Sequence, residues 1–290
     1  MLAILANSAL SLVKERAIQE QTNTDWDRFR SGALAYAAYL DTPAGRLRSD
    51  LAFANLQEFV RIPQPPRSLR ALDIGSGTGA LAVRLARLGV HVTLLDSSPE
   101  MLNLARGAAR EAGVAPNIAL EEGDASQAAN LFSGEVFDLI LCHNVLELVD
   151  DPGAVLRSTT QVMRDSSVLS VLVRTQAGEV CKAAIQAGDL AGAGRSLAAE
   201  WVCESLFGGK VRLFTPETLN AMLRQASLTA TATRGVRVIS DYLPPTISFD
   251  NEYERILELE RELGSRPEFA AVARYAQVLV RRIPDPEQQT

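Results

Sequence analysis

The sequence predicts an α/β fold built on an open, mostly parallel sheet with helices on both faces. Two observations carry this prediction. From residue 69 onward, short apolar runs alternate with helical patterns, which is typical of parallel strands joined by right-handed crossovers. In addition, 47% of the 290 residues are apolar, so the chain can bury a sizeable core in one large domain or two small ones.

Before this alternation begins, the chain is helical in pattern. We expect residues 1–42 to form an N-terminal helical extension. The Pro-Ala-Gly sequence at 43–45 breaks the pattern, and a second helix is expected over 46–60, until the proline cluster at 63–66 ends it. We assign residues 43–290 to one main domain.

The main domain then alternates between strands and helices. The expected strands cover residues 69–74, 90–95, 117–122, 136–142, 168–174, 228–239 and 273–282, and the expected helices cover 79–88, 98–112, 152–164, 216–226 and 253–263. An Ala- and Gly-rich stretch over about 177–215 interrupts this rhythm. We interpret it as a helical insertion that could act as a lid.

The charge balance bears on possible partners. The formal net charge is −6, so the chain exerts no long-range attraction on nucleic acid. Binding to RNA would need a local basic patch, formed if Arg195, Lys210, Arg212, Arg234 and Arg237 converge. Without such a patch, a small organic acid is the expected partner.

Cysteine usage and the first residues bear on location. Cys142, Cys181 and Cys203 show neither a C-x-x-C motif nor the spacing of zinc ligands, so we predict free thiols and no metal site. The apolar run at residues 2–13 is too short to span a bilayer and lacks a cleavage signature. These features predict a cytoplasmic protein without a membrane partner.

Residues 69–79 contain the most informative motif. An apolar run ends in Asp73, and three alternating glycines follow at Gly75, Gly77 and Gly79, immediately before the helical pattern that starts at Ala80. Glycine is needed where φ is positive or where a ligand touches the main chain, and a helix start offers unpaired N–H groups. This strand–turn–helix unit predicts a site for a nucleotide-like cofactor.

Two cofactors fit this turn. The spacing Gly75-x-Gly77-x-x-Ala80, with an acid about twenty residues later, also satisfies the fingerprint of NAD enzymes. However, acids follow three successive strands, at Asp73, Asp96 and Asp124. Three acids at one sheet edge suit a positively charged sulfonium better than a pyrophosphate.

Each of the three acids has a complementary group in S-adenosylmethionine. Asp73 is placed to approach the ammonium group, Asp96 to bind both ribose hydroxyls, and Asp124, beside Ala125, to bind the adenine amino group. Taken singly, each of these acids could instead be a helix cap or a turn residue. As an ordered set, they predict S-adenosylmethionine, with S-adenosylhomocysteine as the product.

Four segments resemble one enzyme family over residues 39–282. The segments cover residues 96–106, 137–152, 235–243 and 253–275. They are similar to the bacterial methyltransferases that esterify 5-carboxymethoxyuridine at the wobble position of tRNA, within the class I S-adenosylmethionine-dependent methyltransferases. The resemblance implies a Rossmann-like sheet of seven strands, in which the last strand lies antiparallel beside the fifth.

The resemblance also implies a set of cofactor-binding residues. Arg48 would bind the carboxylate of the methionine part, and a guanidinium suits this role because it donates two parallel hydrogen bonds. Met101 would pack on the adenine face. The full set that we expect to bind the cofactor is Arg48, Asp73, Gly75, Ser76, Gly77, Gly79, Asp96, Ser97, Met101, Asp124, Ala125 and His143.

The choice of acceptor decides whether catalysis needs a base. A carboxylate is already ionised at neutral pH, whereas a hydroxyl or amine acceptor would require a general base, for which His143 is the candidate histidine. Arg174, Arg212 and Tyr242 are candidates to orient a carboxylate, and Tyr242 also to assist catalysis.

Several functions remain open at this point. The resemblance implies methylation of the carboxylate of 5-carboxymethoxyuridine in tRNA, and the alternative is methylation of a small organic acid or natural product. A non-catalytic cofactor-binding or scaffolding protein and an NAD-dependent reductase are the other hypotheses.

Overall fold

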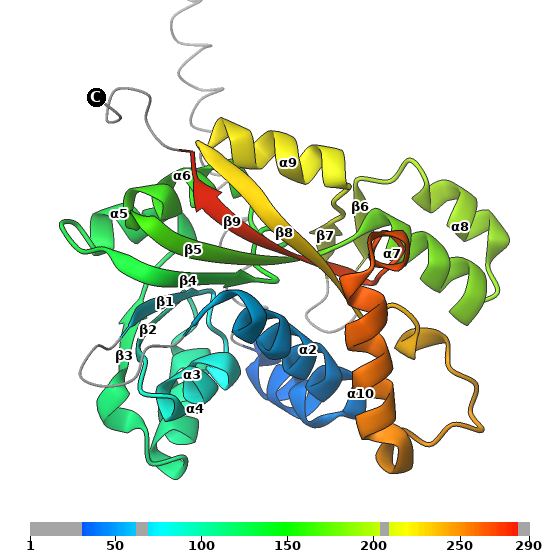
Figure 1. The fold of residues 1–290 in the computed structure, drawn as a ribbon, viewed down its shortest axis with the longest axis horizontal. Helices are drawn as coiled ribbons and strands as arrows, with labels where there is room; N and C mark the ends of the chain where they lie inside the picture. Colours follow the sequence, from blue (N-terminus) through cyan, green and yellow to red (C-terminus); the bar gives the residue numbers. More distant parts are fainter. Residues whose placement is uncertain (1–30, 62–68, 204–208, 284–290) are drawn as a thin grey trace, which may run out of the picture.

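A computed structural model describes residues 31–61, 69–203 and 209–283. It contains a seven-stranded sheet in the order β3-β2-β1-β4-β5-β9-β8 (Figure 1), which confirms the predicted Rossmann-like fold. Most of the expected N-terminal extension lies outside the described residues, and residues 31–41 are helical.

Parallel pairing joins the first five strands. β9 lies between β5 and β8 and is antiparallel to both, so the expected antiparallel last strand beside the fifth is confirmed. The strands are β1 (Arg70–Ile74), β2 (His91–Asp96), β3 (Ile118–Glu122), β4 (Phe137–His143), β5 (Met163–Arg174), β8 (Leu228–Val236) and β9 (Tyr275–Arg282).

Helices cover both faces of the sheet (Figure 1). On one face lie α2 (Pro43–Phe59), α3 (Ala80–Arg87), α4 (Pro99–Glu111) and α10 (Phe249–Ser265), and on the other α5 (Ala128–Leu131), α6 (Pro152–Gln161) and α9 (Pro216–Gln225). The shorter helices are η1 (Ala115–Asn117), η2 (Ala125–Gln127), η4 (Ser240–Tyr242) and α11 (Pro267–Ala270).

Alternating side chains of the central strands build one apolar core on each face. Leu72 and Ile140 pack with α6 and α9 on one face, whereas Ala71 and Leu139 pack with α2, α3 and α4 on the other. Because both faces of the strands are covered, β1 and β4 read as nearly continuous apolar runs.

The stretch that we interpreted as a helical insertion contains helices and a short hairpin. The helices are α7 (Gln176–Cys181), η3 (Lys182–Gln186, π-helical) and α8 (Leu190–Ser196), and the antiparallel strands are β6 (Trp201–Cys203) and β7 (Lys210–Arg212). The hairpin escaped the sequence analysis because strands of three residues give little period-two signal.

Several element boundaries differ from the predicted ones: the helix expected over 152–164 ends at Gln161, and the helix expected over 253–263 covers Phe249–Ser265. Two further differences have a clear local cause. α2 begins at Pro43 rather than at residue 46, because Pro43 is accepted in the first turn and the Thr42 side chain accepts a hydrogen bond from Gly45 N at 3.1 Å. β5 begins at Met163 rather than at residue 168. The polar residues at 164–166 are all exposed, so the start of the strand shows no alternation of apolar and polar residues.

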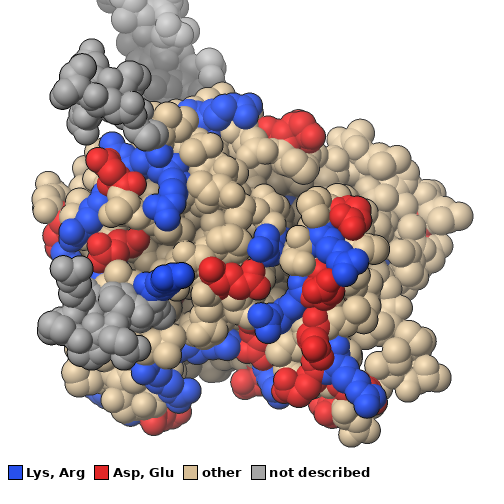
Figure 2. Space-filling view, in the orientation of Figure 1, with Lys and Arg blue, Asp and Glu red and all other residues tan. Residues whose placement is uncertain are grey.

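Charged side chains of both signs intermingle on the face shown in Figure 2.

Among the helices in the described ranges, none combines the length and apolar character needed to cross a bilayer.

A buried carboxylate on α10 fixes the point where β8 ends. Glu260 is fully buried, and its carboxylate accepts hydrogen bonds from the backbone N–H groups of Val238, Ile239 and Ser240 at 2.6, 3.0 and 2.7 Å. The strand predicted to run to residue 239 therefore ends at Val236, because the following N–H groups turn toward α10.

We expect Glu260→Ala to lower the free energy of unfolding by about 3 kcal/mol or more, because three buried N–H groups lose their acceptor. Glu260→Gln, which keeps one acceptor oxygen, should cost less. Chemical denaturation measures both changes. The exposed Glu258→Ala on the same helix is the control, and an equal loss in Glu258→Ala and Glu260→Ala would contradict the assignment.

Candidate functional site

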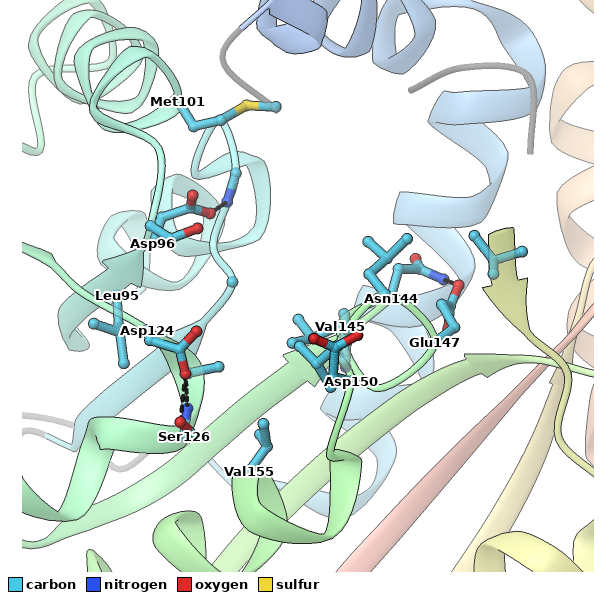
Figure 3. A pocket seen from close by; sticks show the side chains of 18 of the residues that line it. Leu95, Asp96, Met101, Asp124, Ser126, Asn144, Val145, Glu147, Asp150 and Val155 are labelled. Carbon is cyan, nitrogen blue, oxygen red and sulfur yellow. Dashed lines mark hydrogen bonds between the residues drawn. The ribbon is translucent and has the colours of Figure 1, made fainter. Parts of the chain in front are cut away.

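The carboxyl ends of β1 to β4 surround a cavity with a volume of about 440 Å³. Asp96, Met101 and Asp124 lie on one side of it, and Asn144, Glu147 and Asp150 lie opposite (Figure 3). Of the residues expected in the site, the cavity is lined by Arg48, Gly75, Gly77, Asp96, Ser97, Met101, Asp124, Ala125, His143 and Arg174.

The glycine turn after β1 forms one wall of this cavity. Gly75, Gly77 and Gly79 have φ values of 62°, 53° and 71°, a region that L side chains rarely adopt. A Cβ on Gly75 would lie 2.4 Å from Val145 Cγ2, so the turn also needs the absence of a side chain. Gly79 packs under the turn against Leu94 rather than lining the cavity.

Asp96 ends β2 and is held by the backbone on both oxygens. Its Oδ2 accepts from Gly77 N at 2.7 Å and its Oδ1 from Ser98 N at 2.9 Å. Burial raises the pKa of Asp96, and the hydrogen bonds from Ser98, Gly77 and Ser97 oppose this shift. A carboxylate offers about four acceptor positions, so these three backbone hydrogen bonds leave room for a hydrogen bond from a ligand.

Asp124 occupies the equivalent place after β3. Its Oδ1 accepts from Ser126 N at 2.8 Å, which orients the carboxylate as the cap of η2 (Figure 3). Ala125 lines the same wall, and Met101, which is 3% exposed, contributes a thioether from the start of α4. A planar, uncharged ring with a donor group suits this wall.

A second, smaller pocket of about 50 Å³ adjoins the cavity. The two spaces share Tyr36, Arg48, Gly75, His143 and Asn144. The smaller pocket is also lined by Asp73 and Ser76.

Asp73 carries a buried charge without a local partner. It is 4% exposed, and no described residue donates a hydrogen bond to its carboxylate. Burial, together with the nearby charge of Asp96, raises the pKa of Asp73 to about 7.

Arg48 carries a buried charge of the opposite sign. Its guanidinium donates to the Tyr36 hydroxyl at 3.1 Å and lies 5.1 Å from the ring centre of Tyr39 and 5.8 Å from that of Tyr275. Burial lowers the pKa of Arg48, and the three phenols outweigh this effect and raise it. No carboxylate of the described residues pairs with it.

His143 ends β4 between the two spaces. Its Nε2 lies 2.8 Å from Ser170 Oγ, whereas Nδ1 is buried without a partner among the described residues. Burial, aided by the charge of Arg48, lowers the pKa of His143 to about 3, so the ring is neutral at physiological pH.

Glu147 is a site residue that the sequence analysis did not assign. Its Oε1 accepts from Asn144 Nδ2 at 3.0 Å and its Oε2 from Arg174 N at 3.1 Å, while its carbonyl accepts from Arg212 N at 2.8 Å. Burial raises the pKa of Glu147, and Arg174 opposes the shift. A single glutamate in a loop gives no pattern that could have revealed these contacts.

Two of the residues expected to orient an acceptor lie outside the cavity. The Arg212 guanidinium lies 4.2 Å from the ring centre of Trp201, and the Tyr242 hydroxyl donates to the Gly178 carbonyl at 3.4 Å. Arg174 does line the cavity.

The arginines proposed for a basic patch are mostly paired with acids. Arg195 pairs with Asp189 at 3.4 Å, Arg234 pairs with Glu58 at 3.1 Å, and Arg237 pairs with Asp241.

The raised pKa of Asp73 predicts a pH-dependent stability. Because the pKa is about 7 in the folded chain against 3.8 for a free side chain, protonated Asp73 stabilises the fold at low pH, and this contribution is lost as the pH rises through 7. We expect Asp73→Asn to stabilise the protein without ligand at pH 8 by about 2 kcal/mol more than at pH 5.

Thermal denaturation at both pH values measures this difference. The exposed Asp41→Asn is the matched control and should change little at either pH. A gain in Asp73→Asn that is the same at pH 5 and pH 8 would show that the carboxyl group is already ionised at pH 5.

Known proteins share extended sequence similarity with this chain. A family model described as a methyltransferase domain matches residues 66–193. The tRNA 5-carboxymethoxyuridine methyltransferase of Escherichia coli K12 is 30% identical over 247 residues, which are 83% of this chain and 90% of that protein. A ubiquinone biosynthesis O-methyltransferase of Xanthomonas axonopodis pv. citri is 35% identical over 125 residues, 41% of this chain and 50% of that protein.

Solved structures share the fold at low sequence identity. A possible histamine N-methyltransferase of Thermotoga maritima superposes with a TM-score of 0.58 at 16% identity, covering 90% of this chain and 100% of that one. The structure of a DhpI complex with S-adenosylhomocysteine superposes with a TM-score of 0.54 at 17% identity. The match covers 91% of this chain and 97% of that one. Since the E. coli relative matches most of both chains and the sheet has the expected order, this chain belongs to the class I S-adenosylmethionine-dependent methyltransferases.

Proposed function

We propose that this methyltransferase binds S-adenosylmethionine at the edge of β1 to β4 and transfers its methyl group to a carboxylate. One observation carries the proposal. Asp73 and Arg48 are both buried and of opposite charge, neither is neutralised by a described residue, and both line the small pocket. A zwitterionic amino acid, such as the methionine part of the cofactor, complements this pair.

The methionine part would be held by both charges. Arg48 can donate two parallel hydrogen bonds to its carboxylate, and Asp73 can accept from its ammonium group. The ammonium would stabilise the ionised form of Asp73, so ligand binding is expected to bring down the pKa that burial raises. Gly75 and Gly77 line the cavity without a side chain and so leave room for the ligand to approach the main chain, and Ser76 lies beside them in the small pocket.

The nucleoside part would lie in the larger cavity. The carboxylate of Asp96 lines the cavity and keeps acceptor capacity for the ribose hydroxyls, and Ser97 lines the cavity beside it. Asp124 and Ala125 would bind the adenine edge, with Met101 against the ring face. These assignments follow the resemblance and fit the arrangement of side chains.

When bound, S-adenosylmethionine supplies a methyl group that is already activated by the sulfonium. The remaining task of the protein is to hold the acceptor oxygen in line with this methyl group and to exclude water, which can contribute on the order of 7–11 kcal/mol. Arg174 lines the cavity and is the candidate to orient an anionic acceptor. Arg212 and Tyr242 stay candidates only if acceptor binding rearranges β7 or η4.

The E. coli relative suggests the acceptor. Its name identifies a tRNA 5-carboxymethoxyuridine methyltransferase, so the carboxylate of that nucleoside in tRNA is the first candidate. The cytoplasm stays the proposed location. The pairing of Arg195, Arg234 and Arg237 with acids favours a small organic acid as the second candidate.

We expect Arg48→Ala to weaken the binding of S-adenosylmethionine by about 10- to 100-fold, because the two buried hydrogen bonds from the guanidinium to the carboxylate of the cofactor are lost. Calorimetric titration measures the affinity. Arg46→Ala, two residues away and exposed on the far side of α2, is the control and should bind as the wild type does. An unchanged affinity in Arg48→Ala would remove Arg48 from the site.

The acceptor class can be tested with methyl-labelled cofactor and a fractionated cell extract. If the acceptor is a carboxylate, the product is a methyl ester, and mild alkali releases the label as volatile methanol. Label that becomes soluble after ribonuclease treatment would support tRNA, whereas label in ribonuclease-resistant small molecules would support an organic acid. Alkali-stable label would overturn the carboxylate proposal, and the absence of any transfer would favour a non-catalytic role.

A further inference from the structure

A series of buried hydrogen bonds links His143, at the end of β4, to residues on β5, β9 and α2. Asn55 Nδ2 on α2 donates to Gln277 Oε1 on β9 at 3.0 Å, and Gln277 Nε2 donates to Ser170 Oγ on β5 at 3.0 Å. Ser170 Oγ lies 2.8 Å from His143 Nε2. Asn55 is 2% exposed and both Gln277 and Ser170 are fully buried, so water does not compete for these bonds.

The Ala52 carbonyl determines which atoms donate and which accept in this series of hydrogen bonds. Gln277 Nε2 also donates to the Ala52 carbonyl oxygen at 3.0 Å, and a carbonyl can only accept. The amide nitrogen is therefore oriented toward Ser170, and both of its N–H groups are used. Because the Ser170 oxygen accepts one of them, its own proton is left to donate, and His143 Nε2 is the acceptor at hydrogen-bond distance.

We propose that Gln277, acting through Ser170, holds His143 as the neutral tautomer with its proton on Nδ1. In the opposite tautomer, Nε2–H would donate to Ser170, and the serine proton would be buried without an acceptor, which is costly. Nδ1 is buried and unpartnered within the described ranges, and His143 lines both the cavity and the small pocket. His143 therefore offers an N–H donor to a ligand in this site.

This assignment bears on the chemistry of the acceptor, and in that respect it rests on the proposed function. With Nδ1 protonated and Nε2 engaged by Ser170, the ring has no free lone pair to take up a proton. The guanidinium of Arg48, on α2, is the charged group that acts on the ring, and with burial it keeps the ring neutral. His143 can orient a ligand but cannot act as a general base, which suits an acceptor that is already ionised.

Nitrogen NMR distinguishes a protonated from an unprotonated ring nitrogen and so reports the tautomer directly. The protein has two histidines, which makes the signals simple to assign. Protein labelled with ¹⁵N-histidine and free of cofactor is measured by long-range ¹H–¹⁵N correlation between pH 5.5 and 8, and His91→Gln assigns the two rings. We expect His143 to show a protonated Nδ1 and an unprotonated Nε2 throughout. A protonated Nε2, or a titration within this range, would overturn the proposal.

The positioning role of Gln277 is tested by reversing its hydrogen bond. The carboxylate introduced by Gln277→Glu accepts from Ser170, so Nε2 of His143 should become the donor. Ser170→Ala removes the link and should give a mixture of tautomers. Arg281→Gln, at an exposed position of β9, should leave the tautomer unchanged. Retention of the Nδ1–H tautomer in both Gln277→Glu and Ser170→Ala would overturn the role of Gln277.

Titration with S-adenosylhomocysteine separates this inference from the proposed function. We expect Gln277→Glu to weaken binding by about tenfold, because Nδ1 changes from donor to acceptor, and Arg281→Gln to bind as the wild type does. If the wild type shows the Nδ1–H tautomer but does not bind S-adenosylhomocysteine, the proposed function fails and the tautomer stands. If it binds but shows Nε2–H, the tautomer assignment fails alone.

Discussion

Parallel pairing of β1 with β2 on one side and β4 on the other assembles the whole site. This pairing brings the ends of the three strands to one edge, where Gly77 N binds the Asp96 carboxylate at 2.7 Å and Val145 fills the space beside Gly75. Because Gly75 and Gly77 have no side chains, the turn after β1 can lie against both neighbouring strand ends at once. The cavity and the smaller pocket follow from this contact, as does the placement of Asp73 beneath the turn.

Two buried charges at this edge lower the stability of the protein without a ligand. Asp73 and Arg48 are both buried, and neither finds an oppositely charged partner among the described residues. Burying an unpaired charge costs free energy, which a ligand that carries both signs can recover on binding. Elsewhere the same cost is avoided, since the buried Arg274 pairs with Glu179 at 2.5 Å.

The antiparallel β9 connects this edge to the rest of the molecule. It inserts between β5 and β8 and places Gln277 beside Ser170, while Tyr275, at its start, lies near Arg48. The strand that comes last in the sequence thus contributes to a site whose expected cofactor-binding residues, Arg48 to His143, come from the first half of the chain. The orientation of His143 depends on this strand through two hydrogen bonds.

The sequence by itself determined the α/β class, most strands and helices, and the glycine turn with its three acids, because apolar periodicity, positive φ and strand-end position are local properties. The order of the strands and the antiparallel β9 came from the family resemblance rather than from the periodicity. The tertiary structure alone decided that Glu147 joins Asn144 to β5, that Arg212 and Tyr242 lie outside the cavity, and that Gln277 reaches His143 through Ser170. These contacts join residues that are far apart in the chain or lie in irregular loops, and each depends on side-chain direction after packing, which no sequence pattern encodes.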